Sequence, residues 1–527
     1  MKEIIFKGTK TKLAISAYVA LAVVGGFLLL AANSFLMRVV NDYLLVQNFD
    51  GFITPLLLTI GVFILVFAIK GFAKYLQTKF QFSLLIRLIE HCMELLLRTK
   101  SSYFIKISNA ELYTKLRQSC DNVANLVGTL LEGASHITIF IFYGIIIFSI
   151  DMYAGIFTIL FTPIYFFATT RVVDIIAELE HEGMEYAAEL SKVTQETFGD
   201  VRNVKVKGVY SFFILRTVAA LHKIKKNAVK SSVLEYYVSG ITGLLSLAAP
   251  LLAIFAAMRF SPNFAGDAGA ILVLYINIPL FLGSFESVYD QFVEYGFTKP
   301  FIRQLLEFNE LELEKQDGVE IKSFEAIQTE GITVKFSDGR VVTVPDFEVK
   351  IGEKIMLVGE SGAGKSTIFN IIMGLNQEYE GKVLVNGVNL REISLTSLRK
   401  IFGITFQDIN IATLSLCDNI VLGRESNNAR LEKLIKLTSL ENLQETKGDE
   451  MLNNKVLSGG EKSRVGLSQM LVSNPQVMLL DEPFSNMDEE LESQILTKIL
   501  TDYEDRAIIC ISHRSSSEFF FDRVVRL

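Results

Sequence analysis

The stretch Gly359-Glu360-Ser361-Gly362-Ala363-Gly364-Lys365-Ser366 fits the phosphate-binding pattern G-x-x-x-x-G-K-[ST] at every fixed position. Residues 354–358 (KIMLV) before it predict a short buried strand, and residues 366–375 after it predict a helix with apolar residues three and four apart. A phosphate loop needs this context, because its glycines let backbone N–H groups turn inward and the helix N-terminus adds partial positive charge. We therefore expect a phosphate-binding loop here, with Lys365 reaching the outer phosphates.

The composition changes along the chain. Its 527 residues have room for about two to four domains. Half of the residues are hydrophobic, and the mean hydropathy of +0.37 is high for a soluble protein of this length. Long apolar runs dominate up to about Phe292, whereas the sequence after about Leu311 alternates as in a soluble α/β domain. The net charge of -7 is mild and gives no reason to expect nucleic acid as a partner.

The four cysteines and five histidines are scattered, without paired or metal-binding spacing. The cysteines are Cys92, Cys120, Cys417 and Cys510. We expect them to be reduced and partly buried, and we expect no disulfide or zinc framework.

Six apolar segments in the first half are long enough, or nearly so, to cross a hydrocarbon layer of about 30 Å, which takes about 20 helical residues. They are residues 13–37, 52–69, 135–150, 153–169, 236–258 and 268–285. The first is too long for a signal peptide and lacks a small-residue cleavage site. Only Asp151 and Met152 separate the third segment from the fourth, which predicts a tight helical hairpin. We expect a six-helix domain in a lipid bilayer.

Basic residues are concentrated in the two long connections, after the second and after the fourth segment. The opposite loops are short and hold little more than Arg38 and Arg259. By the positive-inside rule, the N-terminus, both long connections and the C-terminal half are cytoplasmic. The membrane is expected to be the cell membrane, plasma or inner, crossed several times.

Both long connections keep helical periodicity, over residues 70–98 and 175–230, so the membrane helices are expected to extend far into the cytoplasm. Short turns are expected near residues 101–109 and 205–213. The aromatic residues in these turns are Tyr103, Phe104, Tyr210 and Phe212. Either they form surfaces that dock onto another domain, or they pack between the helices of their own hairpin.

Carboxylates lie close to the last apolar run. Glu286 and Asp290 follow it one helical turn apart, and Glu132 lies at a comparable depth on the third segment. In a cytoplasmic cavity they would favour a cationic or amphipathic cargo, and the alternative is a solvated helix end beyond the membrane.

The second half begins after a charged, acidic segment, residues 308–323. Strands are predicted at 332–336 and 340–344 around an Asp338-Gly339 turn, at 382–385 and at 404–406, and a helix is predicted at 431–440. Gln407 directly follows the last of these strands.

Three further motifs follow in the second half. Ser458 is placed to cap a helix, with Glu461 completing a capping box, and the glycine pair between them can bind an anion. Residues 477–481 predict a buried strand that delivers Asp481 and Glu482 to its C-terminal edge, where α/β sheets place their chemistry. Residues 507–512 predict another buried strand, with His513 at its end.

In this order, the motifs resemble those of ATP-binding cassette (ABC) transporters, specifically half-transporters with the exporter arrangement, and the resemblance covers essentially the whole chain. Residues 359–366 are similar to Walker A, Gln407 to the Q-loop, 457–461 to the signature motif, 477–481 to Walker B, 485–488 to the D-loop and His513 to the switch histidine. Tyr103-Phe104 followed by Asn109-Ala110-Glu111-Leu112 looks like the first coupling region.

Three positions depart from the family pattern. The signature ends in Glu461 where Gln is usual, and the D-loop reads Ser-Asn-Met-Asp rather than Ser-Ala-Leu-Asp. Phe336 stands where the adenine-stacking residue is usually Tyr, which keeps the π face and loses only the hydroxyl. None of the departures removes a catalytic group.

The resemblance implies ATP and Mg²⁺ as cofactors and assigns roles to the motif residues. The residues that bind ATP would be Phe336, Gly359, Ser361, Gly362, Ala363, Gly364, Lys365, Ser366 and Thr367, with Ser458, Gly459 and Gly460 acting on the ATP of a second subunit. Ser366, Gln407 and Asp481 would hold the metal. Glu482 would activate the attacking water, and Gln407 and His513 would sense the γ-phosphate.

The expected fold is an all-α six-helix membrane domain with long cytoplasmic helix extensions, followed by a cytoplasmic α/β P-loop NTPase domain. The expected boundaries are 1–310 for the membrane domain, 311–325 for a linker and 326–527 for the nucleotide-binding domain. The resemblance implies a dimer with a second half-transporter, and we favour a second copy over a different subunit. With few residues before the first segment, no N-terminal peptidase is expected.

The expected function is ATP-driven export of a hydrophobic or amphipathic compound, such as a peptide, lipid or drug, by alternating access. Two alternatives stay open. One is an importer built on the exporter arrangement, as in some siderophore systems, and the other is an ATP-gated channel or regulatory membrane ATPase.

Overall fold

The computed structural model describes residues 9–44, 46, 49–107, 109–199, 201–261, 264, 267–336, 339–360, 362–448 and 450–527. The chain forms two compact units, one of Met1–Met93 with Tyr113–Asn309 and one of Glu94–Leu112 with Glu310–Leu527. A short segment of the N-terminal half therefore belongs to the second unit.

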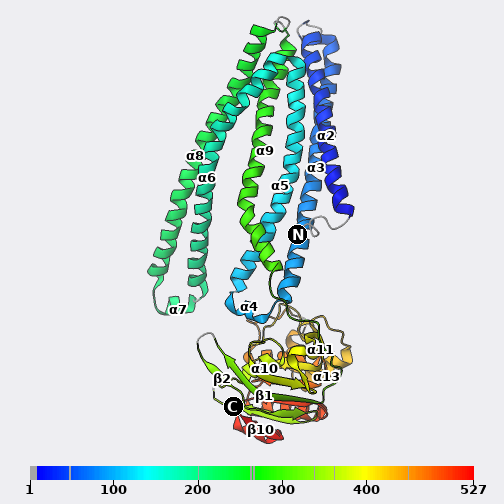
Figure 1. The fold of residues 1–527 in the computed structure, drawn as a ribbon, viewed down its shortest axis with the longest axis vertical. Coiled ribbons are helices and arrows are strands. Elements are labelled where there is room, and N and C mark those ends of the chain that lie inside the picture. The colour runs from blue at the N-terminus through cyan, green and yellow to red at the C-terminus, as the bar shows by residue number, and fades with distance from the viewer. Residues whose placement is uncertain are drawn as a thin grey trace. The chain divides into compact units, whose positions relative to one another are not determined.

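Long helices make up the first unit (Figure 1). They are α2 (Thr9–Arg38) with the π-helix η1 (Val39–Leu44), α3 (Phe49–Leu97), α5 (Asn109–Ile150), α6 (Met152–Gly199), α7 (Val201–Val206), α8 (Tyr210–Phe260) and α9 (Ala268–Asn309). All six predicted apolar segments lie on these helices, and Asp151 alone separates α5 from α6, so the tight hairpin is confirmed.

Five described helical stretches are long and apolar enough to cross a membrane. They are Ile15–Leu44, Gly51–Leu97, Glu111–Ile150, Tyr210–Phe260 and Ala268–Asn309. On the helix that carries the fourth predicted segment, Met152–Ala168 is a shorter apolar stretch at the beginning of α6. Because a helix satisfies its own backbone hydrogen bonds, apolar helices of this kind suit a bilayer interior.

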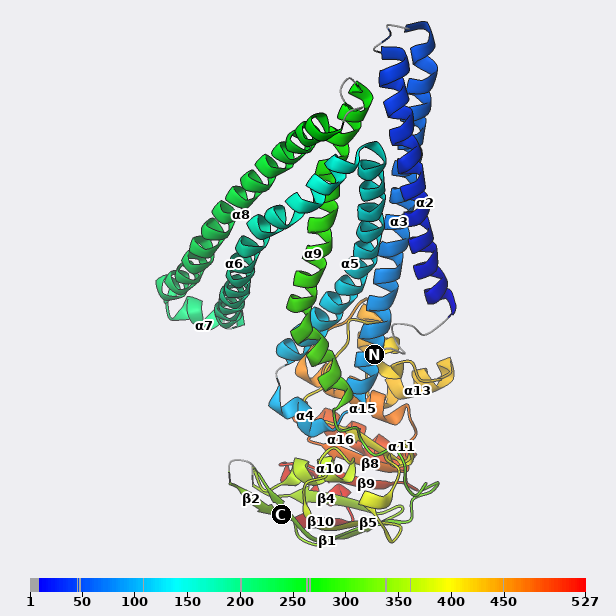
Figure 2. The same ribbon diagram turned by 45° about the horizontal axis from the view of Figure 1, so that its top comes forward.

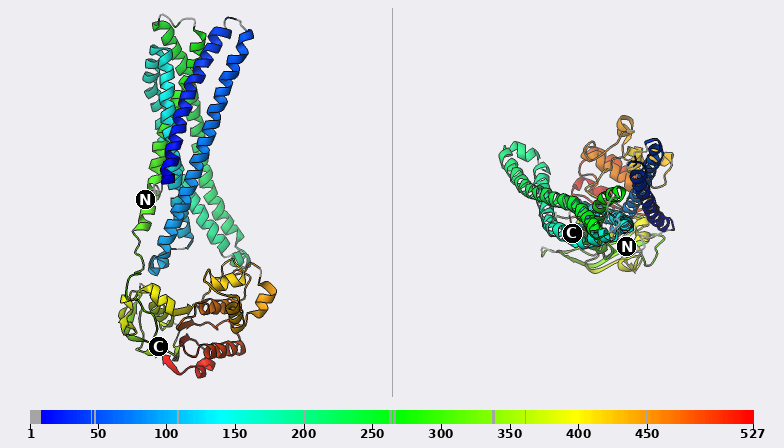
Figure 3. Two further views of the ribbon diagram at one scale, coloured as in Figure 1. Left: turned by 90° about the vertical axis from the view of Figure 1, so that its right-hand side faces the viewer. Right: turned by 90° about the horizontal axis from the view of Figure 1, so that it is seen from above.

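The helices extend well beyond their apolar parts, as predicted. Helices α6 and α8 run side by side to the short α7, which joins them through residues 207–209 (Figure 2; two further views in Figure 3). The first predicted turn contains the short helix α4 (Ser101–Lys106), which belongs to the second unit. The rings of Phe104, Tyr210 and Phe212 are exposed, which favours docking surfaces over packing within the hairpins.

The carboxylates near the apolar runs contact neighbouring helices. Glu132 of α5 accepts hydrogen bonds from Lys74 Nζ at 3.1 Å and from Gln77 Nε2 at 3.2 Å, both on α3. Glu286 of α9 accepts a hydrogen bond from the Tyr165 hydroxyl of α6 at 2.8 Å. These contacts join pairs of helices, and the role of the carboxylates toward a cargo stays a prediction.

Two sheets and their surrounding helices make up the rest of the second unit. The antiparallel sheet has the order β2-β1-β5-β6, with β3 also pairing with β1, and the parallel sheet has the order β10-β4-β9-β8-β7. The strands are β1 (Ala326–Lys335), β2 (Val341–Thr343), β3 (Glu348–Lys350), β4 (Lys354–Val358), β5 (Glu380–Val385), β6 (Val388–Asn389), β7 (Phe402–Thr405), β8 (Val477–Asp481), β9 (Ala507–Ile511) and β10 (Arg523–Arg526). The helices are α10 (Lys365–Ile372), η2 (Leu390–Glu392), α11 (Leu395–Ile401), α12 (Leu416–Val421), α13 (Asn428–Leu437), α14 (Glu441–Lys447), α15 (Gly459–Leu471), α16 (Glu489–Asp502) and η3 (Ser515–Phe520).

Most predicted elements of this half are observed, with shifted ends. The strands predicted at 354–358 and 477–481 have the predicted bounds, whereas the strand predicted at 404–406 is observed as β7, which begins two residues earlier and ends at Thr405, two residues before Gln407. The helix predicted at 431–440 is α13, which begins three residues earlier. Asp338 of the predicted turn lies outside the described residues.

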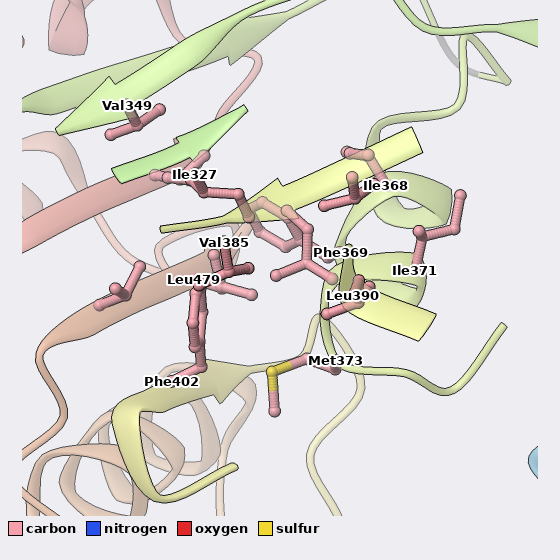
Figure 4. Packing of buried hydrophobic residues seen from close by; sticks show 14 of the residues in the cluster. Ile327, Val349, Ile368, Phe369, Ile371, Met373, Val385, Leu390, Phe402 and Leu479 are labelled. Carbon is pink, nitrogen blue, oxygen red and sulfur yellow. The ribbon is translucent and has the colours of Figure 1, made fainter. Parts of the chain in front are cut away.

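Buried side chains from both sheets pack around α10 and form the main core (Figure 4). Phe369 of α10, Ile327 of β1 and Leu479 of β8 are all fully buried within this cluster. A second core lies on the other side of the parallel sheet, where Met478 and Leu480 of β8 pack with residues of α15 and α16. The alternation along β8 therefore divides a continuously apolar strand between two cores, as expected for a parallel sheet covered on both faces.

Candidate nucleotide site

The phosphate loop runs from the end of β4 to the first residue of α10. Gly362 and Gly364 have φ of +89° and +96°, in the left-handed region that favours glycine. A β-carbon at Gly364, the N-cap of α10, would also clash with the side chain of Val342. Gly359 lies close to the Leu527 carbonyl oxygen, 3.0 Å from where a β-carbon would lie. The predicted glycine requirement of the loop therefore has both a conformational and a steric cause.

Lys365 is buried inside this loop, with 6% of its surface exposed. Its ammonium donates to the carbonyl oxygens of Gly359 at 2.8 Å and Glu360 at 2.9 Å. The Ala363 amide closes the same turn by donating to Glu360 at 3.1 Å. The loop thus holds a compact cation next to the N-terminus of α10, which is the charge pattern that binds phosphate.

The next two residues of α10 were also predicted to bind the nucleotide. Ser366 lies at the second position of the helix and its hydroxyl donates to Asp481 Oδ1 at 3.1 Å. Thr367 follows at the third position, and Ser361 lies outside the described residues. The Walker A helix and the end of β8 are thereby joined through one hydrogen bond.

Asp481 is a buried carboxylate with 5% of its surface exposed. Burial raises its pKa, and the neighbouring Glu482 carboxylate raises it further, against the opposite influence of the Ser366 hydroxyl and the Lys365 ammonium. In the protein alone, neighbouring groups therefore do not fully offset the cost of burying the negative charge of Asp481. A cation beside Ser366 and Asp481 would offset that cost.

Glu482 is held between the Q-loop and the switch histidine. Its Oε1 lies 2.8 Å from His513 Nε2, and its Oε2 accepts a hydrogen bond from Gln407 Nε2 at 3.2 Å. The three residues follow β8, β9 and β7, which are neighbouring strands of the parallel sheet. The structure thus brings together all three residues predicted to be catalytic, at the carboxyl edge of the sheet.

The backbone of Glu482 has a φ of +47°, in the left-handed region that non-glycine residues seldom adopt. Its amide donates to the Ile511 carbonyl of β9 at 3.1 Å, and its carbonyl accepts from the Ser485 amide at 3.2 Å. The turn after β8 is therefore fixed on both sides of the residue. Strain of this kind is retained where surrounding structure determines the conformation, and it is frequent at active sites.

The signature segment forms the predicted helix cap. Ser458 is the N-cap of α15, and its hydroxyl accepts from the Glu461 amide while Glu461 Oε2 accepts from the Ser458 amide at 2.7 Å. Burial works to raise the pKa of Glu461, but hydrogen bonds from the Ser458 amide and hydroxyl, together with the charges of Lys447 and Arg464, leave the pKa below its usual range. The departure from Gln to Glu at this position thus preserves the cap.

The glycines of the signature lie against the D-loop. A β-carbon at Gly459 would come within 3.0 Å of the Asn486 side chain, and one at Gly460 would lie 2.9 Å from the Asn486 carbonyl oxygen. Asn486 is one of the positions that depart from the family pattern, and it fills the space beside the two glycines. The signature and the D-loop therefore form one packed surface.

Phe336 follows β1 and packs partly buried at the margin of the main core. The Arg340 guanidinium lies 5.4 Å from the centroid of its ring. Phe336 and Val342 come from the same β1–β2 segment of the antiparallel sheet, and Val342 touches the phosphate loop at Gly364. The adenine-stacking role of Phe336 stays a prediction.

Sequence reasoning missed an ion pair next to His513, in which the carboxylate is buried and the guanidinium partly exposed. Arg514 pairs with Glu492, which has 2% of its surface exposed, and donates to the Met487 carbonyl of the D-loop at 2.7 Å. Ser517 donates to the other oxygen of Glu492 at 2.6 Å. The pair thus connects the switch loop, the D-loop and α16, and a basic residue directly after the switch histidine was the available signal.

Apolar helices long enough to span a membrane and an α/β unit with this constellation define the class of ATP-driven membrane transporters. Residues 15–285 match the family model of the ABC transporter transmembrane region, and residues 342–485 match that of the ABC transporter. The first match covers more than half of the chain, so the chain belongs to the ABC transporter family. It is a multi-pass membrane protein.

Two curated relatives match large parts of the chain. The lacticin-481/lactococcin-DR transport/processing ATP-binding protein of Lactococcus lactis subsp. lactis is 25% identical over 417 residues, which are 75% of this chain and 57% of that protein. The ATP-dependent lipid A-core flippase of Methylobacillus flagellatus is 28% identical over 354 residues, 64% of this chain and 59% of that protein. The chain thus spans less than two thirds of the length of these relatives.

A solved structure shares the fold over almost the whole chain. The structure of a bacterial Atm1-family ABC exporter with ATP bound has a TM-score of 0.77 and 19% sequence identity, and covers 98% of this chain and 93% of that one. The membrane half and the nucleotide half therefore both have the exporter fold.

Proposed function

We propose that the chain is one half of an ATP-driven exporter that hydrolyses ATP to move a hydrophobic or amphipathic compound across a membrane. The observation that carries this proposal is Glu482, held between His513 and Gln407 beside the Ser366–Asp481 pair of the phosphate loop. Such a complete set of acid, sensor and phosphate-binding groups suits a subunit that turns over ATP. The family, the exporter fold and the apolar helices support the transport part.

The chain's own residues would bind both the phosphates and the adenine of ATP. The glycine-rich loop directs backbone N–H groups at the β- and γ-phosphates, and Lys365 moves from the carbonyls that it contacts to the phosphate oxygens. Phe336 would stack on the adenine. Positioning and charge neutralisation of this kind supply most of the catalysis in phosphoryl transfer.

The residues near Ser366 fit a bound Mg²⁺. Magnesium prefers oxygen ligands, which the Ser366 hydroxyl and the Asp481 carboxylate offer side by side, whereas Gln407, also predicted to hold the metal, contacts Glu482 in the structure. The raised pKa of Asp481 indicates a buried carboxylate that lacks a full counter-charge. When bound, the metal neutralises charge on the phosphates. Ser366 and Asp481 are the residues that would hold it.

Glu482 would accept the proton of the attacking water. Its two carboxylate oxygens already contact His513 and Gln407, and these contacts fix the position of the carboxylate. The left-handed turn after β8 sets the direction of the side chain. On ATP binding these two residues would turn to the γ-phosphate and release Glu482 for the water. The catalytic base is thus held in place before the substrate arrives.

A second chain would complete each site. The described side-chain contacts of Ser458 go to Glu461 at the start of its own helix, so the signature surface can present its N-terminal amides to another subunit. Two copies would form two such composite sites across a twofold axis. We favour this homodimer over a pair with a different half-transporter.

ATP binding would draw the two nucleotide units together, and the exposed turns around Phe104 and Phe212 would carry that motion to the helices. Hydrolysis would reset the assembly and give alternating access. We place the N-terminus and the nucleotide unit in the cytoplasm of a plasma or inner membrane, on the strength of the basic connections.

Glu482→Gln tests this function directly. The variant should keep its affinity for ATP and lose turnover by about a hundredfold or more, because the amide cannot take a proton from water. ATP binding and hydrolysis are measured on the purified chain in lipid vesicles. Substantial remaining ATPase activity would show that the base is another residue.

The direction of transport separates the exporter from its alternatives. Fluorescent lipid and hydrophobic peptide probes are added to sealed inside-out vesicles with ATP, and their accumulation is compared between the wild type and Glu482→Gln. Accumulation in the wild type alone supports export. ATP-dependent depletion would indicate an importer, and an ATP-dependent ion current would indicate a channel.

A further inference from the structure

The acidic segment between the two halves is firmly attached to the second unit. The Val319 amide donates to the Glu392 carbonyl at 2.8 Å, and the Ser394 amide donates to the Val319 carbonyl at 3.1 Å, which forms a parallel bridge. At Gly318 a β-carbon would lie 2.5 Å from the Glu392 carbonyl oxygen, so glycine is needed for this close approach. Further along, the buried Phe324 donates its amide to the Gln476 side chain at 2.7 Å. We call residues 310–324 the strap, because little of it is free to act as a loose tether.

The beginning of the strap pairs with the segment that leads into α4. Thr99 and Leu313 form an antiparallel bridge. The Lys100 amide donates to the Glu312 carbonyl at 3.1 Å, and the Glu314 amide donates to the Arg98 carbonyl at 2.7 Å. Residues 98–100 directly precede α4, which carries Tyr103 and Phe104. These backbone bonds explain why Glu94–Leu112 belongs to the second unit.

One side chain of the strap makes a partly buried, bidentate ion pair. Both carboxylate oxygens of Glu314 accept from the Arg399 guanidinium, at 2.7 and 2.9 Å. The Glu314 side chain is 10% exposed, and that of Arg399 is 34% exposed. A bidentate pair of this kind fixes the orientation of both partners as well as their distance.

The same guanidinium also reaches the Walker A helix. Arg399 Nε donates to the carbonyl oxygen of Met373, the C-cap of α10, at 3.3 Å. Lys365 and Ser366 lie at the other end of this eight-residue helix, about 12 Å away along its axis. A short helix moves as a rigid body, so a shift of its N-terminus toward a phosphate also shifts its C-terminus.

We propose that the strap couples the Walker A helix to the membrane-loop segment at α4, and that Arg399 is the positioning residue through which it acts. Motion of α10 on nucleotide binding passes from Met373 to Arg399, then to Glu314, and then through the backbone pairing to residues 98–100. This inference rests on the proposed function, since it needs nucleotide at the phosphate loop. The strap would be a coupling route within one chain, in addition to the docking of the exposed turns on a partner chain.

The neighbouring contacts are less suited to this task. Lys100 and Glu312 also form an ion pair, at 2.6 Å, but the Glu312 side chain is 79% exposed. Exposed pairs contribute little because solvent and salt screen them. We therefore assign the coupling to the backbone bridge and to the Glu314–Arg399 pair.

The test uses the full-length chain in lipid nanodiscs, with hydrogen–deuterium exchange measured before and after addition of AMP-PNP and Mg²⁺. In the wild type, nucleotide should change the exchange of peptides covering residues 94–107. Arg399→Met and Glu314→Gln should each reduce that change by about fivefold or more, while the KM for ATP stays within about twofold. Arg399→Lys keeps a cation that can donate to Glu314 and to the Met373 carbonyl, and should restore part of the response. The matched control is Lys335→Met with Glu380→Gln, which removes an exposed ion pair of the same unit and should leave the response unchanged.

The outcomes separate the two proposals. If the wild type neither binds nor hydrolyses ATP, the proposed function fails. If it does both and the response at residues 94–107 persists in Arg399→Met and in Glu314→Gln, only the coupling route is overturned. A parallel loss of ATP affinity and thermal stability in Arg399→Met, without partial recovery in Arg399→Lys, would also overturn it, because the pair would then be merely structural. Should Arg399→Met fail to fold, the milder Glu314→Gln decides between these outcomes.

Discussion

At the scale of single residues, the site depends on carboxylates that the fold treats differently. Asp481 and Glu482 are neighbours in sequence, yet one is buried beside the phosphate loop and the other is held by His513 and Gln407. The tight left-handed turn at Glu482 causes this separation. Adjacent acids can therefore take different roles, one toward the metal and one toward water.

The raised pKa of Asp481 predicts that its charge destabilises the folded chain in the absence of nucleotide. Because the folded state holds the proton more tightly than the unfolded state, stability falls as pH rises from the ordinary aspartate range through the raised pKa. Asp481→Asn keeps an oxygen for the Ser366 hydroxyl and should raise the Tm at neutral pH. The gain should shrink as the pH is lowered through the raised pKa.

Thermal unfolding of the full chain in detergent, from acid to neutral pH, measures this difference. The same variant should lose Mg²⁺-dependent ATPase activity, and Ser366→Ala is the control for loss of the hydrogen bond alone. An Asp481→Asn chain that is less stable than the wild type at neutral pH would contradict the prediction.

The pKa of Glu461 is shifted in the opposite direction to that of Asp481, so its charge stabilises the folded chain. Its lowered pKa means that the ionised cap stabilises the folded state above the ordinary glutamate range, and this contribution is lost as pH falls through the lowered value. Glu461→Ala removes half of the capping box and should cost about 0.5–2 kcal/mol at neutral pH. Glu461→Gln, the usual family residue, can accept the Ser458 amide bond and should lose only the charge-dependent part. Equal Tm values for the three chains at neutral pH would contradict this interpretation.

At the scale of elements, the switch loop is held by Arg514, which contacts both α16 and the D-loop. Arg514 follows β9, Glu492 lies in the first turn of α16, and Met487 belongs to the D-loop. Removing one partner of a buried ion pair leaves an uncompensated charge, which typically costs about 3–5 kcal/mol. Glu492→Gln should therefore lower the Tm of the nucleotide unit by about 6–20 °C.

Unfolding followed by calorimetry of the full chain checks this value, since the nucleotide unit is expected to melt as one transition. The double variant Glu492→Leu with Arg514→Met is the informative control, because replacing both charges with apolar groups should recover much of the loss. A single variant with unchanged Tm would show that the pair is solvated in solution.

Local elements were readable from the sequence, whereas their long-range contacts were not. The strands at Lys354–Val358 and Val477–Asp481 and the cap at Ser458 follow from patterns within a few residues. The Glu314–Arg399 pair joins positions 85 residues apart, and the bridge from Thr99 to Leu313 joins even more distant ones. No periodicity or motif marks such pairs, so the strap appeared in the sequence only as an acidic linker.

At the scale of the whole molecule, we propose that one chain supplies only half of each catalytic site. The phosphate loop, Asp481 and Glu482 meet at one edge of the parallel sheet, while the signature surface around Ser458 packs on its own D-loop. Family and fold indicate a dimer, but the pairing of sites across it is a proposal. A complementation experiment with two defective chains can decide it.

One chain carries Lys365→Ala and the other carries Ser458→Arg, each with a different affinity tag, and mixed dimers are purified through both tags. If each ATP is bound by the phosphate loop of one chain and the signature of the other, the mixed dimer keeps one intact site and should show about half of the wild-type turnover. Each variant alone should be inactive. The matched control pairs the wild type with a chain carrying both substitutions, where both composite sites are broken and no activity is expected. Because the two mixtures contain the same substitutions in the same proportion, only their distribution between chains differs. Activity in the control but not in the first mixture would instead place each complete site within a single chain.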